Sequence, residues 1–88
     1  MKRIAVLLTM HFDNSKGNFE ELRQQELVHI LNWKKEGVLE NFYIKSARDG
    51  AMLIFKDLDE SAVRENVQHL PFFPYLEKVE FIAFDKQF

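Results

Sequence analysis

Four short apolar segments and two longer helical ones alternate along the chain, and their order leaves few folds open. Lys2 to Met10 is a short run rich in Ile, Val and Leu, which is typical of a buried strand. Asn18 is a predicted N-cap, with Glu21 three residues later as in a capping box. Gly37 is the residue at which this helix is predicted to end. The sequence therefore predicts a strand followed by a helix that ends near Glu36.

The second half of the chain continues with two strands, a helix and a final strand. Arg48-Asp49-Gly50 has the Asp-Gly chemistry of a tight turn, so the strands on either side should form a hairpin. Asp57 or Asp59 is the expected N-cap of the second helix. The predicted elements are, in order, a strand at Val38 to Ser46, a strand at Ala51 to Lys56, a helix ending near His69, and a strand at Leu76 to Phe84.

This order, β-α-β-β-α-β, predicts an α+β fold of the ferredoxin-like kind. Right-handed crossovers would place both helices on one face of a four-stranded antiparallel sheet. No linker composition interrupts the 88 residues, so residues 1–88 are expected to form a single domain.

Composition excludes several classes of protein. The chain has no cysteine, which rules out a disulfide framework and a thiolate zinc site. Its longest apolar run, Ile4 to Met10, is far shorter than the roughly 20 residues of a membrane span. The formal net charge is −2, without the basic footprint of a nucleic-acid-binding protein. We therefore expect a soluble, cytoplasmic protein that binds neither nucleic acid nor membrane.

Both faces of the predicted sheet are apolar. A one-sided antiparallel sheet should alternate apolar and polar residues, and two helices cover only one face. The chain also carries nine Phe, a large apolar load for 88 residues. We therefore predict a homodimer that packs sheet on sheet as a dimeric α+β barrel. Assembly of such dimers into a higher oligomer is compatible with this prediction. The alternative is a monomer with an unusually apolar sheet.

A glutamate falls on the apolar side of the first helix. On a helical wheel Glu26 projects between Phe19 and Trp33, Arg23 projects from the same face, and His29 lies at its edge. A carboxylate in an apolar stripe is costly unless it is paired, and such groups cluster at functional sites. Glu26 is thus a candidate general base or ligand contact. The alternative is a structural ion pair between Glu26 and Arg23.

Other candidate residues carry weaker signals. The three histidines (His11, His29 and His69) lack the close spacing of metal ligands, so no metal site is expected. The aromatic residues Tyr43, Phe72, Phe73 and Tyr75 are either core residues or pocket walls.

The segment Leu70-Pro71-Phe72-Phe73-Pro74-Tyr75 resembles the Leu-Pro-x-Phe-Pro-Tyr signature of muconolactone isomerases. The resemblance, weaker outside this motif, extends from Arg23 to Phe81 and implies the dimeric α+β barrel fold. These enzymes shift a proton between carbons of an unsaturated lactone without metal or cofactor. Their Lys-x-x-Glu pair on the first helix matches Arg23-Gln24-Gln25-Glu26 here.

The resemblance therefore implies that Glu26 is the acid/base. Arg23 stands where the family has lysine, and an arginine suits a carboxylate clamp better than a proton carrier. His29, Trp33 and Tyr75 are the further candidate substrate contacts. A small unsaturated acid or lactone is the expected substrate. Two alternatives stay open: a non-catalytic homodimer that binds a small apolar ligand or serves in assembly, and the cofactor-free monooxygenase chemistry that occurs on the same barrel.

Overall fold

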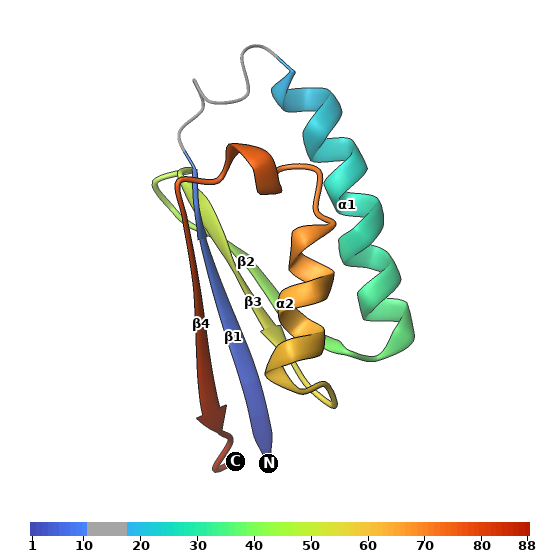
Figure 1. Cartoon of the computed structure of the whole chain (residues 1–88), viewed down its shortest axis with the longest axis vertical. Coiled ribbons are helices and arrows are strands. Elements are labelled where there is room, and N and C mark those ends of the chain that lie inside the picture. The colour runs from blue at the N-terminus through green and yellow to red at the C-terminus, as the bar shows by residue number, and fades with distance from the viewer. Residues whose placement is uncertain (11–17) are drawn as a thin grey trace.

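A computed structural model describes residues 1–10 and 18–88 of the chain. The predicted order of strands and helices is confirmed (Figure 1). One short 3-10 helix, within the proline segment, was not predicted from the sequence. The elements are β1 (Lys2–Thr9), α1 (Phe19–Glu36), β2 (Leu39–Ile44), β3 (Gly50–Phe55), α2 (Glu60–Gln68), the 3-10 helix η2 (Phe73–Tyr75) and β4 (Lys78–Asp85).

Two of the four helix ends follow the predicted local chemistry, those at Gly37 and Asp59. Gly37 ends α1 in the left-handed conformation at φ 82°, and His69 follows the last residue of α2. The Asp59 side chain caps α2 by accepting a hydrogen bond from the Ala62 N–H at 2.8 Å, which decides between the two predicted caps. Asn18 precedes α1 as predicted, but its side chain makes no capping hydrogen bond, so the predicted capping box is wrong.

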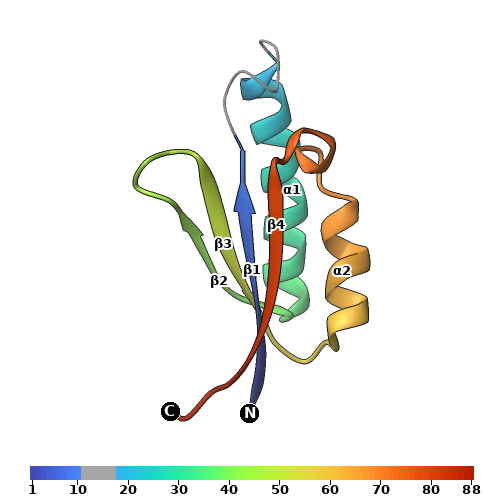
Figure 2. The ribbon, with the colours of Figure 1, turned by 60° about the vertical axis from the view of Figure 1, so that its left-hand side comes forward.

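The sheet has the strand order β2-β3-β1-β4, with every neighbouring pair antiparallel. Ile4 of β1 stands opposite Phe55 of β3 and Ala83 of β4, which fixes the register of the central strand. Figure 2 shows both helices on one side of the sheet. The fold is therefore the predicted ferredoxin-like α+β fold.

The core lies between the helices and this face of the sheet. Val6, Leu53 and Phe55 of the sheet are fully buried, as are Val63 and Val67 of α2. α1 contributes the Trp33 ring, which packs edge-on against Phe55 with ring centroids 5.3 Å apart. Among the described residues, neither helix is long and apolar enough to cross a membrane.

The opposite face of the sheet carries no helix, yet it is apolar over its centre. The register places Ala5 beside Ile82 and Ile54, and Leu7 beside Met52, with Glu80 the one charged neighbour of Leu7. Ile82 is 39% exposed. The prediction that both faces of the sheet are apolar is thus confirmed.

Candidate functional site

A cavity of about 360 Å³ lies between α1, the sheet and the proline segment. Its size falls in the range of small-molecule sites. Apolar side chains make up most of its wall, and charged residues supply only three positions. The lining residues are Leu8, Met10, Phe19, Arg23, Glu26, Leu27, Ile30, Phe42, Ile44, Arg48, Gly50, Ala51, Phe72 and Leu76.

Glu26 is the only carboxylate among these lining residues. It reaches the cavity because α1 presents Phe19, Glu26 and Ile30 on one face, with Glu26 two turns after Phe19 and Ile30 one turn after Glu26. Its Oε1 accepts a hydrogen bond from the backbone N–H of Phe72 at 3.3 Å. Burial raises the pKa of Glu26 from 4.5 to about 7, and the hydrogen bond from Phe72 opposes that rise. The carboxyl therefore changes its protonation state near neutral pH.

Arg23 lines the same cavity, so the structure brings together the two residues that match the isomerase pair. Its guanidinium Nη2 lies 3.4 Å from Oε2 of Glu20, and both side chains are more than half exposed. The structural ion pair between Arg23 and Glu26 that the sequence left open is not the pairing found among the described residues. Since exposed ion pairs contribute little free energy, Arg23 can exchange Glu20 for another anion.

The other three predicted site residues lie outside the lining of the cavity. Trp33 is only 7% exposed and belongs to the core. The His29 ring packs against Trp33 with centroids 6.1 Å apart. Tyr75 lies half-buried in η2. Their role as substrate contacts stays a prediction, and the cavity gives it no support.

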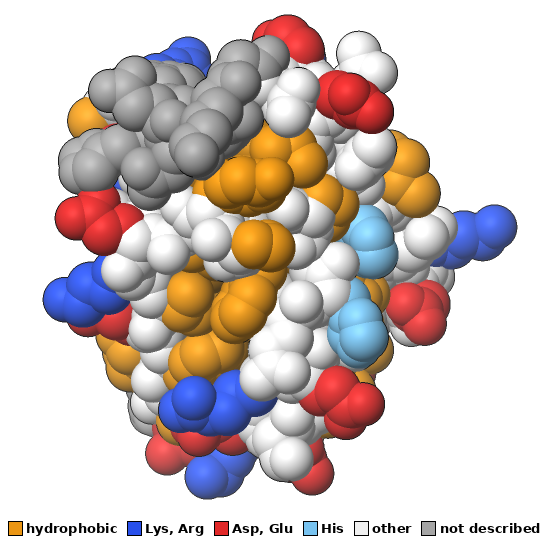
Figure 3. Space-filling view, turned by 45° about the horizontal axis from the view of Figure 1, so that its top comes forward, with side chains coloured by type: hydrophobic (Ala, Val, Ile, Leu, Met, Phe, Trp, Pro, Cys, Tyr) orange, Lys and Arg blue, Asp and Glu red, His pale blue; other side chains and the backbone are white. Residues whose placement is uncertain are grey.

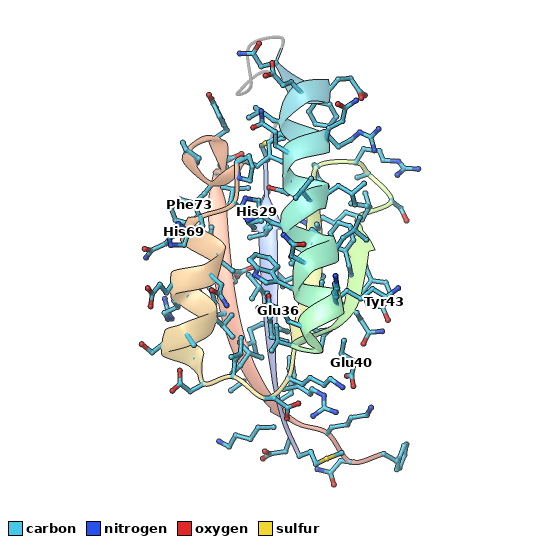
Figure 4. All side chains as sticks on the ribbon, turned by 90° about the vertical axis from the view of Figure 1, so that its right-hand side faces the viewer. His29, Glu36, Glu40, Tyr43, His69 and Phe73 are labelled. Carbon is cyan, nitrogen blue, oxygen red and sulfur yellow. The ribbon has the colours of Figure 1, made fainter. Side chains whose placement is uncertain are left out.

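The two described histidines lie on the same side of the molecule. Figure 4 shows His29 on α1 and His69 at the end of α2, and two histidine side chains are adjacent on the surface in Figure 3. No group of three His, Asp or Glu side chains in residues 1–10 and 18–88 is placed to hold a metal ion. His11 lies outside the described residues.

Sequence reasoning found part of the cavity wall and missed another part. Phe72 was named as a core residue or pocket wall. Its ring lines the cavity and packs on Phe19 with centroids 5.4 Å apart. The sequence predicts Arg48 only as a turn residue, although it lines the same cavity. No pattern in the sequence marks Arg48 as a site residue; only the structure shows its place on the cavity and its left-handed backbone at φ 62°.

No known family model and no curated protein matches the sequence. Two solved structures are similar to it over nearly the whole chain. One is 5-chloro-2-hydroxyhydroquinone dehydrochlorinase (TftG) from Burkholderia phenoliruptrix, in complex with 2,5-dihydroxybenzoquinone. It is 11% identical, with a TM-score of 0.59, and the match covers 97% of this chain and 93% of that one.

The other is a hypothetical protein from Pyrococcus horikoshii. It is 9% identical, with a TM-score of 0.54, and the match covers 99% of this chain and 93% of that one. At such low identity the likeness shows the fold alone. The chain therefore shares its fold with an enzyme that acts on a small molecule.

Proposed function

We propose that the chain is a cytoplasmic, muconolactone isomerase-like enzyme that moves a proton on a small unsaturated acid or lactone without a cofactor. One observation carries the proposal: the carboxyl of Glu26 lies in an apolar cavity of about 360 Å³, where burial raises its pKa to about 7. A base whose pKa is close to the working pH is well matched to proton transfer at carbon.

In the proposed reaction, the Glu26 carboxylate takes a proton from a carbon that lies between a carbonyl group and a carbon–carbon double bond. The electron pair of the broken C–H bond moves into the conjugated system, which becomes a dienolate. The resulting carboxylic acid of Glu26 returns the proton to the far end of that system, so that the double bond migrates. The Arg23 guanidinium, on the same cavity wall, would bind the carboxylate or the developing enolate oxygen.

The ligand bound to the similar dehydrochlorinase supports a small molecule as the substrate of this chain. That enzyme was solved with 2,5-dihydroxybenzoquinone. The shared fold does not carry its reaction over to this chain. It supports only a small cyclic, unsaturated ligand for a cavity whose wall is mostly apolar.

We further propose that a second copy of the chain covers the open face of the sheet. Along this face the partly exposed apolar side chains of Leu7, Met52, Ile54 and Ile82 lie on three neighbouring strands. Apolar patches of this kind mark interaction surfaces. Sheet-on-sheet packing would bury them in a homodimer.

One observation favours a second candidate function, a non-catalytic homodimer that binds a small apolar ligand. The Glu26 carboxylate already has a structural partner in the backbone N–H of Phe72, 3.3 Å away. In that case Glu26 would hold the proline segment against α1, and no proton would reach a ligand.

A proton-exchange assay separates the two candidates. The protein is incubated in D₂O with α-angelica lactone, an unsaturated lactone, and NMR follows deuterium incorporation and migration of the double bond. We expect both with the wild type, and a loss of at least about 100-fold in rate for Glu26→Gln. Glu36→Gln removes a carboxylate from an exposed position of the same helix and is the matched control. Exchange by Glu26→Gln at the wild-type rate would show that Glu26 is not the base. No exchange by the wild type would favour the binding protein.

A further inference from the structure

Two arginines from separate parts of the fold line the candidate cavity. Arg23 comes from the second turn of α1, and Arg48 comes from the turn that joins β2 to β3. Figure 1 shows the N-terminal half of α1 and this turn at the same end of the molecule. Both side chains belong to exposed residues. Both arginines therefore reach the solvent, whereas Glu26 is half-buried.

The charge of the lining is unbalanced. Ten of its fourteen residues are apolar, Gly50 has no side chain, and the remaining three are Arg23, Arg48 and Glu26. With the Glu26 carboxyl ionised, the lining has a net charge of +1, and with the carboxyl protonated the charge is +2. An apolar cavity with an excess of guanidinium charge favours an apolar ligand that carries anionic groups.

The backbone conformation of Arg48 independently indicates a functional role for this residue. Arg48 adopts φ 62°, a left-handed conformation that is strained for any residue with a Cβ atom. Its N–H closes the turn on the Lys45 carbonyl at 2.9 Å. Glycine or asparagine would occupy this turn position with less strain. Residues held in such conformations cluster at active and ligand-binding sites, although Asp57, away from the cavity, adopts φ 60° as well.

The partners of the two arginines leave them able to bind a ligand. Arg23 has only the exposed Glu20 carboxylate at 3.4 Å among the described residues. Within the same part of the chain, no side-chain hydrogen bond or ion pair of the Arg48 guanidinium is found. A guanidinium binds a carboxylate through two parallel hydrogen bonds, so each arginine can hold one anionic group.

We infer that the cavity binds a dianionic ligand, a small unsaturated or aromatic dicarboxylate, with one carboxylate on Arg23 and the other on Arg48. Arg48 is then a further binding residue of the site, and it selects for the second charge. The inference rests on the proposed function in that it concerns the same cavity. It requires no turnover and no proton transfer by Glu26.

The test measures binding by calorimetry with three probes of similar size: isophthalate with two carboxylates, benzoate with one, and benzamide with none. The wild type should bind isophthalate most tightly and benzamide least. Arg48→Gln should weaken isophthalate binding about tenfold or more, the loss of one charge-assisted hydrogen-bonded pair, and should bring it close to benzoate. Benzoate binding should change much less, because Arg23 remains.

Two further variants keep the result interpretable. Lys35→Gln removes one positive charge from an exposed position at the far end of α1 and should leave all three affinities unchanged. Arg48→Gly relieves the strain at φ 62° and should fold at least as stably as the wild type, yet lose the preference for isophthalate. Equal binding of the three probes by the wild type, or an unchanged preference in both Arg48 variants, would overturn the inference. The role of Glu26 would still be decided by the proton-exchange assay.

Discussion

The Glu26 carboxylate on α1 accepts a hydrogen bond from the backbone N–H of Phe72 in the proline segment, with 3.3 Å between Oε1 and N. This contact joins two elements that are 46 residues apart in the sequence. It also sets the ionisation of Glu26, because burial disfavours the charged carboxylate and the N–H partly compensates. The same two residues line the candidate cavity, so the chemistry of the site and the packing of the fold depend on one contact.

Glu26→Gln should stabilise the protein at alkaline pH. Burial raises the pKa of Glu26 from 4.5 in the unfolded chain to about 7 in the folded chain, so the folded state binds more protons between these values. Wild-type stability therefore falls as the pH rises through this window and stays low above it. The amide carries no charge and keeps an acceptor for the Phe72 N–H. We expect a gain on the order of 1–3 kcal/mol at about pH 8 and little gain at about pH 4.

Urea denaturation at a series of pH values measures this difference. Glu36→Gln, at an exposed position of α1, is the control and should not reproduce the gain. A constant difference between wild type and Glu26→Gln at every pH would contradict the assigned burial of Glu26.

Glu40→Gln should lower the stability of the fold at neutral pH and make that stability less sensitive to acid. The Arg3 side chain hydrogen-bonds Glu40 at 2.9 Å and holds the pKa of that carboxyl at about 2, below its ordinary value of 4.5. A lowered pKa contributes stability above the unfolded value, and this contribution is lost as the pH falls from about 4.5 to about 2. Thermal melts at a series of pH values in this range should show that the melting temperature falls more steeply with pH for the wild type than for Glu40→Gln. Parallel curves would show that the pair contributes nothing.

Ile82→Asp should dissociate the proposed homodimer. Ile82 is 39% exposed on the open face of the sheet, and a buried unpaired charge there would prevent sheet-on-sheet packing. Light scattering should give about twice the chain mass of 10.5 kDa for the wild type and the single-chain mass for the variant. Val28→Asp introduces the same charge on the exposed side of α1 and should remain dimeric. A monomeric wild type at micromolar concentration would contradict the proposal.

Gly50→Ala should disrupt the part of the sheet that lines the cavity. A Cβ atom at Gly50 would stand 1.9 Å from the backbone carbonyl oxygen of Leu8, which cannot move aside without breaking the pairing of β1 with β3. We expect a loss of at least about 2 kcal/mol in the free energy of unfolding. Gly37→Ala meets nothing within 4 Å and has only the left-handed backbone to strain, so it should cost about 1 kcal/mol. Equal losses in the two variants would contradict the close approach at Gly50.

The order of elements was predictable from sequence because it depends on local signals. The apolar run of β1, the glycine after α1 and the acidic cap of α2 each determine a boundary through nearby residues alone. The prediction that the Asn18 side chain caps α1 was wrong. A cap depends on a hydrogen bond made by the side chain, and composition does not determine whether that bond forms. The 3-10 helix was missed because a three-residue turn has no periodicity to detect.

The sequence predicted only those residues of the candidate site that lie on one face of α1. The wheel identified Glu26 and Arg23 because both lie on α1, and the structure places both on the cavity. Arg48 comes from a turn that approaches α1 only in the folded chain, and no pattern in the sequence connects the two. Trp33 illustrates the converse, since its position on the same face serves the core.

The most direct test of the account is a titration of the Glu26 carboxyl itself. The chain is labelled with ¹³C at the glutamate carboxyl carbons, and the Glu26 resonance is assigned by its absence from Glu26→Gln. The account predicts a midpoint at about pH 7, because burial in the cavity disfavours the carboxylate. A midpoint near the ordinary value of 4.5 would mean that Glu26 is ionised and well solvated, and the proposed general base would be contradicted.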